Sequence, residues 1–348
     1  MKKVIIILIS ILAIAGIIIG LNFNKIKDNL KPNPYIELGY SKSDLKVINT
    51  LKNPDIILKY KYDKNIIAII KNKDFAETNL PNYLALLNSN LELDDIILIG
   101  NKYYDENITY TNDIVSLMKE KYYIHDNLER YLKYRETYDK DNYNLVLEVN
   151  ANLDKTFYVD TEPADLSKEN LILVNKFYYL DKDYMPDDLV LIDAKYGVRQ
   201  YIKSITYEAY KTMWEAASNE GLTLYINSPY RSYNTQSGLY NNYAARDGIS
   251  LADTYSARPG FSEHQTGLAF DVTSKTTNFD NFAYSNEYKW LQDNAYKYGF
   301  ILRYPKGKEY ITGYQYESWH YRYVGKDIAK YIHDNDITYE EYYAYFVK

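Results

Sequence analysis

The sequence contains no cysteine, and this absence excludes several ways of stabilising or activating a protein. Without thiols the chain has no disulfides, no thiolate metal ligands and no lipid-modified N-terminal cysteine. Histidine is scarce as well, with four residues in a chain of 348. Any metal ion would have to be held by imidazole and carboxylate groups, so each histidine has to be considered as a ligand.

An excess of positive charge is also missing. The 41 Lys and Arg residues are outnumbered by 47 Asp and Glu residues, which gives a formal net charge of −6. Nucleic acid is therefore not expected as a partner, because binding to phosphates needs a basic surface. The 43 tyrosines accompany many Lys, Asn and Ile residues and indicate AT-rich codon usage, with a wall-binding surface as the alternative.

The N-terminal segment Val4–Leu21 has no charged residue. As a helix its 18 residues would extend roughly 27 Å, close to the ~30 Å hydrocarbon core of a bilayer. We expect a transmembrane anchor at 4–21, a cytoplasmic tip at 1–3 and a polar linker at 22–34. A cleaved signal peptide ending near Ala13-Ile14-Ala15 is the alternative. Lysines flank the segment on both sides in nearly equal number, so charge alone does not set its orientation.

The rest of the chain changes character near residue 141. Residues 35–140 show apolar side chains at helical spacing and are predicted to form a mostly helical module of unknown role. Beyond them, amphipathic helices are predicted at 205–220 and 285–298, each followed by a glycine. Short β-type runs occur at 144–150, 157–160, 171–175, 189–193 and 222–226. This mixture lacks a regular strand–helix alternation and predicts an α+β domain at 141–348, with an antiparallel sheet and flanking helices.

The stretch SARPGFSEHQTGLAFDV, residues 256–272, carries the first candidate site. Bulky and small side chains alternate at 267–272 with the period of two of a strand. The bulky face would enter a core, and the other face would present Asp271 beside glycine and alanine. His264 lies seven positions earlier across a turn, so both side chains are expected to converge.

The stretch YQYESWHYRYVG, residues 314–325, carries the second candidate site. Glu317 and His320 would share a face of a helix, whereas in a strand they need a twist or bulge at 318–319. Two histidines and Asp271 would leave a fourth tetrahedral position for water, as catalytic zinc sites do. From spacing alone, a hydrogen-bonded core histidine with two surface carboxylates remains the alternative.

These motifs resemble the two signatures of the VanY-type D-alanyl-D-alanine carboxypeptidases. The matching patterns are S-x-H-x2-G-x-A-x-D at 262–271 and E-x-W-H at 317–320, and the likeness extends from about residue 142 to 346. The same group of zinc peptidases includes D-Ala-D-Ala dipeptidases, LD-carboxypeptidases and the hedgehog signalling domain. The resemblance therefore implies a hedgehog- or DD-peptidase-like fold.

The resemblance also implies a role for each matching residue. Zn²⁺ would be bound by His264, Asp271 and His320, with a zinc-bound water as nucleophile and Glu317 as general base. Arg231 would stabilise the developing oxyanion. Two polar residues would hold the terminal carboxylate of the substrate, namely Gln236 and Ser262.

The implied activity is removal of the C-terminal D-alanine from peptidoglycan stem peptides. An LD-carboxypeptidase acting on tetrapeptide stems and a non-catalytic, metal-containing wall-binding module are the alternatives. With the anchor at 4–21, we expect a single-pass protein of a Gram-positive cell membrane, with its catalytic domain outside the cell. The sequence does not indicate an oligomeric state.

Overall fold

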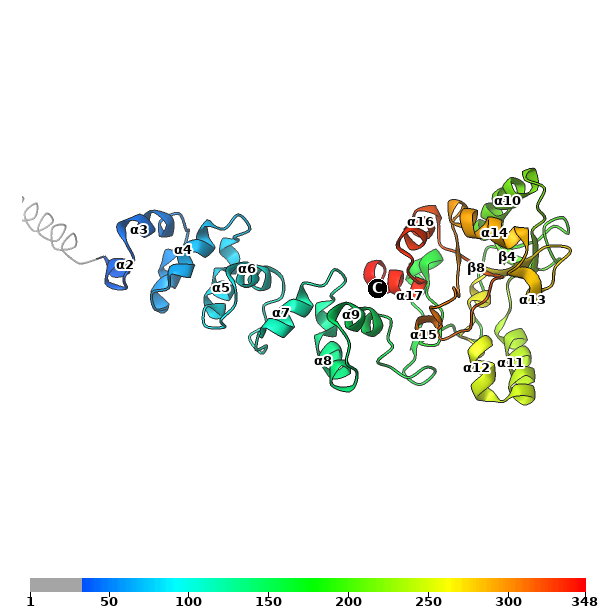
Figure 1. The fold of residues 1–348 in the computed structure, drawn as a ribbon, viewed down its shortest axis with the longest axis horizontal. Coiled ribbons are helices and arrows are strands. Elements are labelled where there is room, and N and C mark those ends of the chain that lie inside the picture. The colour runs from blue at the N-terminus through cyan, green and yellow to red at the C-terminus, as the bar shows by residue number, and fades with distance from the viewer. Residues whose placement is uncertain (1–32) are drawn as a thin grey trace, which may run out of the picture. The chain divides into compact units, whose positions relative to one another are not determined.

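The computed structural model describes residues 33–348. The predicted anchor at 4–21, the tip at 1–3 and all but the end of the linker at 22–34 lie outside this range. Within 33–348, no helix is long and apolar enough to cross a membrane. The chain forms two compact units that divide between Lys119 and Glu120, ahead of the domain start predicted at residue 141. Figure 1 labels helices and strands of both units.

The N-terminal unit consists of short helices with polar caps. At the start of α3, Ser41 and Asp44 form a reciprocal capping box, and at the start of α4 the Asp63 side chain accepts from the backbone N–H of Asn65. Isoleucines and leucines at helical spacing supply its core, including Ile66 and Ile69 of α4. The α-helices are α2 (Pro34–Glu37), α3 (Lys42–Ile48), α4 (Lys64–Lys71), α5 (Leu80–Leu86), α6 (Leu93–Lys102) and α7 (Asn112–Met118).

A helical motif occurs twice in the chain, at 64–102 and again at 112–150. Helices α8 (Leu128–Thr137) and α9 (Asn142–Asn150) complete the second copy. In each copy an asparagine of the last helix accepts hydrogen bonds from a tyrosine hydroxyl and from an earlier asparagine. The same tyrosine oxygen accepts from a backbone N–H seven residues before it. The matched residues are Asn79, Tyr83 and Asn101 in the first copy and Asn127, Tyr131 and Asn150 in the second. The shared bonds identify an internal repeat, and the unit boundary falls inside its second copy.

The C-terminal unit is built on a four-stranded antiparallel sheet in the order β5–β6–β8–β7. This arrangement confirms the predicted α+β class with an antiparallel sheet. The strands are β5 (Tyr225–Ser228), β6 (Ala269–Thr273), β7 (Phe300–Leu302) and β8 (His320–Tyr323), and two small pairs are formed by β1 (Glu162–Pro163) with β2 (Tyr178–Tyr179) and β3 (Leu189–Leu191) with β4 (Tyr201–Lys203). The helices are α10 (Ser204–Asn219), α11 (Tyr233–Asp247), α12 (Ile249–Tyr255), α13 (Phe279–Phe282), α14 (Asn286–Asn294), α15 (Glu309–Thr312), α16 (Lys326–Asn335) and α17 (Tyr339–Phe346).

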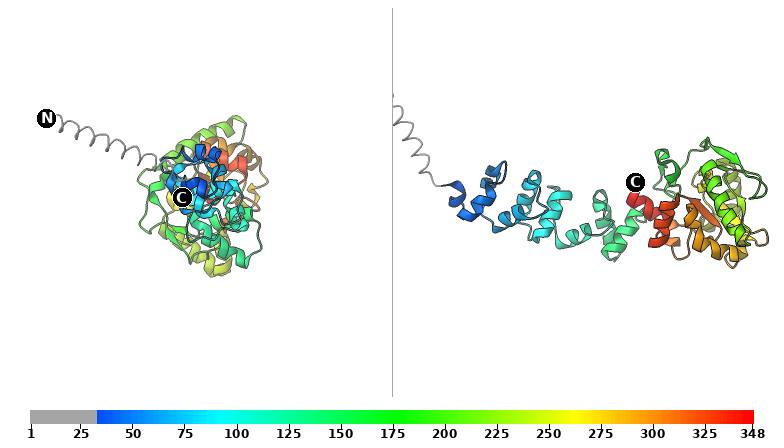
Figure 2. Two further views of the ribbon diagram at one scale, coloured as in Figure 1. Left: turned by 90° about the vertical axis from the view of Figure 1, so that its left-hand side faces the viewer. Right: turned by 90° about the horizontal axis from the view of Figure 1, so that it is seen from above.

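Two apolar clusters hold this sheet. One face packs Phe270 of β6 and Tyr321 of β8 against α10 and α14. The second cluster joins Ile301 of β7 to residues of α16 and α17, the red helices at the C-terminal end in Figures 1 and 2. The opposite face of β6 and β8 is therefore left for polar side chains, and it forms the floor of a cleft.

Some of the helices and strands predicted from the sequence are present in the structure, and others are not. The helices predicted at 205–220 and 285–298 are confirmed as α10 and as α14 followed by a 3-10 turn, and both end before a glycine with positive φ. The strand predicted at 144–150 is wrong, because these residues belong to helix α9, whose start is capped by Asp141. The runs at 157–160 and 171–175 contain no strand, because they form turns and coil, whereas 189–193 contains β3.

The repeated hydrogen-bond cluster gives a stability prediction. We expect Asn150→Ala to lower the free energy of unfolding by about 1–3 kcal/mol, because the Tyr131 hydroxyl and the Tyr122 carbonyl lose a partner. Denaturant unfolding followed by circular dichroism measures this change. The exposed Asn241→Ala on α11 is the control, with an expected change below about 0.5 kcal/mol. Equal effects of the two substitutions would contradict the assignment.

Candidate metal centre

Strands β6 and β8 place two of the predicted ligands opposite each other. Asp271 pairs directly with His320 across the antiparallel ladder, and the neighbouring pair Phe270 and Tyr321 points to the other face, into the core. Glu317 and His320 are separated by a turn at 318–319, so the expected departure from a regular strand is confirmed. The sheet pairing thus fixes the separation of two polar groups that are distant in sequence.

His264 reaches the same point from a short 3-10 helix, Glu263–Thr266, which is separated from β6 by two residues. The intervening Gly267 has φ +67, and a Cβ atom there would lie 3.0 Å from the backbone nitrogen of Lys203. Only glycine accepts both this backbone conformation and this close approach. The glycine of the motif therefore allows the tight turn that carries the chain from His264 into the strand with Asp271.

The imidazole nitrogens are oriented for ligation. Nδ1 of His264 lies 2.7 Å from the carbonyl oxygen of Pro229, which can only accept, so this nitrogen donates and Nε2 keeps its lone pair. That Nε2 lies 3.4 Å from Oδ2 of Asp271, and Nδ1 of His320 lies 3.2 Å from Oδ1. One ligand atom from each of the three residues lies within 4.8 Å of the others.

The donor set fits a divalent cation. All three side chains are buried, and Oδ1 of Asp271 has no hydrogen-bond partner within the described part of the chain. A buried carboxylate oxygen without a partner is costly, and a cation between the carboxylate and two imidazoles removes that cost. Two imidazoles and one carboxylate are the ligand types that zinc prefers in catalytic sites.

Burial and the charges of neighbouring side chains shift the pKa values of His264, Asp271 and His320. Burial lowers the pKa of His264, and the Arg231 guanidinium lowers it further, which favours the neutral ligand form. Burial opposes ionisation of Asp271, but His264 and His320 outweigh it and hold the pKa of that carboxyl far below its usual range. Burial also opposes protonation of His320, but contacts with Asp271 and Glu263 raise its pKa to about 9.

Glu317 and Arg231 each lie next to one of these three residues. Oε2 of Glu317 is 3.6 Å from Nδ1 of His320, and burial raises the pKa of Glu317 to about 8. Arg231 lies 3.6 Å from Oδ2 of Asp271 and donates to Oγ of Ser228 at 2.7 Å. A carboxyl that gains and loses a proton near neutral pH and a fixed cation therefore face the same three ligands.

All seven residues predicted for the site line one open cleft of about 840 Å³. Gln236 is buried and fully engaged: its Oε1 accepts from Arg231 at 2.6 Å, and its Nε2 donates to the carbonyl oxygen of Ala257 at 2.7 Å. Ser262 is buried at the cleft wall, two residues before His264. The fold brings these seven residues together, because they lie on separate segments of the chain: α11 and the turn before it, the 3-10 helix and the residue before it, β6, and β8 with the turn before it.

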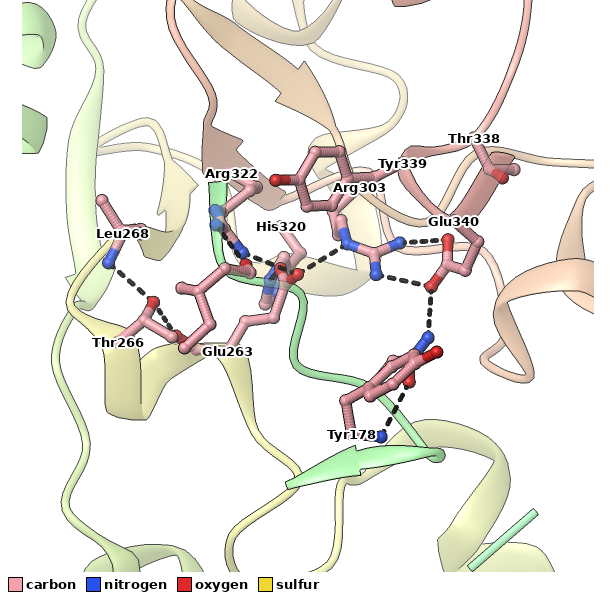
Figure 3. A network of polar contacts seen from close by, with 12 residues as sticks. Tyr178, Glu263, Thr266, Leu268, Arg303, His320, Arg322, Thr338, Tyr339 and Glu340 are labelled. Atoms are coloured by element: carbon pink, nitrogen blue, oxygen red, sulfur yellow. Dashed lines mark hydrogen bonds and ion pairs between the residues drawn. The ribbon is translucent and has the colours of Figure 1, made fainter. Parts of the chain in front are cut away.

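Sequence reasoning missed a group of charged residues behind the ligands. Glu263, Arg303 and Arg322 have almost no exposed surface, and each arginine forms an ion pair with Glu263 (Figure 3). One signal was available: Arg322 follows His320 by two positions and therefore shares its face of β8. A charged residue on the inward face of a strand requires a buried partner, but the sequence does not say which.

The arrangement is typical of metal-dependent hydrolases, with three ligands, a carboxyl of raised pKa and a fixed guanidinium in a cleft. Residues 199–326 match the family model described as VanY, D-alanyl-D-alanine carboxypeptidase. The chain is 45% identical over 206 residues to the Bacillus subtilis protein YodJ, which bears a carboxypeptidase name; the match covers 55% of this chain and 76% of YodJ. It is 33% identical over 199 residues to a D-alanyl-D-alanine carboxypeptidase of Enterococcus faecalis, covering 54% of this chain and 71% of that protein.

Among solved structures, the LD-carboxypeptidase LdcB matches with a TM-score of 0.50 and 46% identity, over 53% of this chain and 90% of LdcB. The chain therefore belongs to the VanY D-alanyl-D-alanine carboxypeptidase family, and the resemblance inferred from the motifs is confirmed. Its C-terminal unit is a carboxypeptidase domain.

The raised pKa of His320 predicts how metal binding depends on pH. Below about pH 9 the metal has to displace a proton from this imidazole, so affinity should rise about tenfold per pH unit between roughly pH 6.5 and 8.5. Competition with a chelator, using Zn²⁺ as the probe and corrected for proton binding by the chelator, measures the slope. In Glu317→Gln, which has no carboxyl proton to release at this position, a tenfold change per pH unit would assign the released proton to His320. An affinity independent of pH would contradict the assignment.

Proposed function

We propose that this protein is a zinc-dependent carboxypeptidase that removes the C-terminal D-alanine from peptidoglycan stem peptides. The observation that carries the proposal is the convergence of His264, Asp271 and His320 on one point of a cleft that also contains Glu317. The Enterococcus faecalis relative, named as a D-alanyl-D-alanine carboxypeptidase, supports the substrate class.

Zn²⁺ is the cofactor we propose for the three ligands. When bound, it supplies Lewis acidity and makes a water molecule acidic enough to lose a proton near neutral pH. The protein prepares the ligand atoms beforehand: the Pro229 carbonyl orients His264, and the sheet register sets Asp271 opposite His320.

Glu317 is proposed as the general base. Its carboxyl is buried beside His320, and its pKa of about 8 reflects that burial. A divalent cation held by the neighbouring ligands would favour the ionised form and move the pKa towards neutrality. A carboxylate in this range accepts a proton from the attacking water and then donates it to the leaving amine.

Arg231 is proposed to stabilise negative charge that develops on the scissile carbonyl oxygen. Its guanidinium is held by Gln236 and Ser228, and its backbone N–H donates to the carbonyl of His264. A donor held on three sides needs no reorganisation during the reaction. Gln236 acts in this scheme first by holding Arg231, because both ends of its amide are already hydrogen-bonded. To contact the terminal carboxylate of the substrate, Gln236 has to give up one of these bonds. Ser262 is the second residue that we propose to contact this carboxylate.

The proposed cellular location is the outer side of the membrane. Assembled peptidoglycan lies there, so we propose that the anchor at 4–21 spans the membrane and that the C-terminal unit acts on the outer side. The uncharged composition of 4–21 and the polar linker after it support this proposal.

An LD-carboxypeptidase is the second candidate function. LdcB, described as an LD-carboxypeptidase, is 46% identical over the matched region, compared with 33% for the enterococcal D-alanyl-D-alanine carboxypeptidase. Both activities release a terminal D-alanine and share the same metal chemistry. They differ in the chirality of the residue before the scissile bond.

Substitution of the proposed base separates binding from chemistry. We expect Glu317→Gln to retain Zn²⁺, because Glu317 is not among the three ligands, and to lose about 10²–10⁴-fold in kcat. Bound metal is measured by elemental analysis and turnover by release of D-alanine. Normal turnover in this variant would exclude Glu317 as the base.

Defined substrates separate the two candidate activities. The zinc-loaded full-length protein is incubated with muropeptides that carry pentapeptide stems or tetrapeptide stems, and the products are weighed by mass spectrometry. Loss of one alanine from the pentapeptide is expected for the DD activity, and loss from the tetrapeptide for the LD activity. Glu317→Gln serves as the matched control. No loss from either substrate would exclude both proposals.

A further inference from the structure

Glu263 is a buried carboxylate at the metal centre to which the reaction assigns no task. It precedes His264 in the 3-10 turn, and its side chain has no exposed surface. Figure 3 shows its carboxylate next to the His320 ring and between the guanidinium groups of Arg303 and Arg322. Burial of an ionised carboxylate is expensive, so both of its oxygens need an explanation.

The two oxygens of Glu263 face different partners. Oε1 accepts hydrogen bonds from Nε of Arg303 at 2.8 Å and from a terminal nitrogen of Arg322 at 3.0 Å. Oε2 lies 3.6 Å from Nε2 of His320. Neither Oε2 nor this Nε2 has a hydrogen-bond partner within residues 33–348. Two buried polar atoms that lack other partners therefore face each other, on the side of the imidazole opposite to Asp271.

His320 has to present Nδ1, and only Nδ1, to the metal. That nitrogen lies 3.2 Å from Oδ1 of Asp271, among the candidate ligand atoms. A neutral imidazole carries one proton, so ligation through Nδ1 places the proton on Nε2, where an acceptor is required. Glu263 supplies the acceptor. Ligand histidines typically donate their second nitrogen to a carboxylate in this way.

We propose that Glu263 is a positioning residue for the metal centre, which accepts the Nε2 proton of His320 and thereby fixes the ring with Nδ1 directed at the cation. This inference rests on the metal centre proposed above. Glu263 does not touch substrate in this scheme and acts only through His320.

The arginines hold Glu263 in place. Arg303 makes a two-pronged contact with Glu340 of α17, at 2.9 and 2.6 Å. Arg322 donates to the backbone carbonyls of Asn170 and Ile172. The two carboxylates and two guanidiniums carry no net charge together. This neutral group leaves the negative charge of Asp271 available for a cation.

The test compares Glu263→Gln with Glu340→Gln in the full-length protein. Both substitutions remove one carboxylate charge from Arg303, but only Glu263 faces His320. We expect Glu263→Gln to weaken Zn²⁺ affinity about 10–100-fold in chelator competition. Glu340→Gln should lower the thermal midpoint and keep Zn²⁺ affinity within about threefold. Affinity for Zn²⁺ within twofold of wild type in folded Glu263→Gln would overturn the proposal.

A spectroscopic measurement covers the case in which Glu263→Gln does not fold. The chain has four histidines, so ¹⁵N-histidine labelling gives four imidazoles to assign. In the zinc-loaded wild type we expect the His320 proton on Nε2, in slow exchange with water. A proton on Nδ1 would overturn the proposal without any variant. Failure of wild-type protein to bind Zn²⁺ would instead reject the metal centre itself.

Discussion

The antiparallel register between β6 and β8 is the constraint on which the site depends. It sets Asp271 opposite His320, and it sends the adjacent pair Phe270 and Tyr321 into the core beneath α10 and α14. A slip by one residue would exchange these faces, burying a carboxylate among aromatic rings and exposing two large apolar side chains. Packing of the core therefore enforces the geometry of the ligands.

Charge is arranged in two groups around the His320 imidazole. On one side Asp271 and Glu317 face the cleft, with Arg231 held by neutral partners. On the other side the carboxylates of Glu263 and Glu340 are balanced by two buried arginines. Without those arginines, the inner carboxylates would compete for the same proton and the same cation. Their neutralisation confines the unbalanced negative charge to the side of the candidate metal ligands.

The sequence predicted the parts of the site that depend on local pattern. The alternation at 267–272 indicates a strand with one small face, and the glycine after His264 indicates a turn, so the approach of His264 to Asp271 could be predicted. The full set of candidate ligands came from the resemblance to the VanY-type family. The inner network could not, because Glu263 meets Arg303 across 40 residues and Arg322 across 59. Pairing at that distance is decided by topology, which one sequence does not display. The error at 144–150 has a local cause: its Leu- and Val-rich run suits a strand, and the Asp141 cap and packing of Asn150 make it a helix.

The C-terminal helix links the second repeat copy to the metal network within the C-terminal unit. Tyr122, whose carbonyl accepts from Asn150 of α9, stacks on Tyr345 of α17 with ring centroids 3.9 Å apart. Five residues earlier in the same helix, Glu340 holds Arg303. One part of the surface of α17 thus packs against Tyr122, and another part carries Glu340, which pairs with Arg303 behind His320. This double contact accounts for the packing of residues 120–150 against α17 within one compact unit.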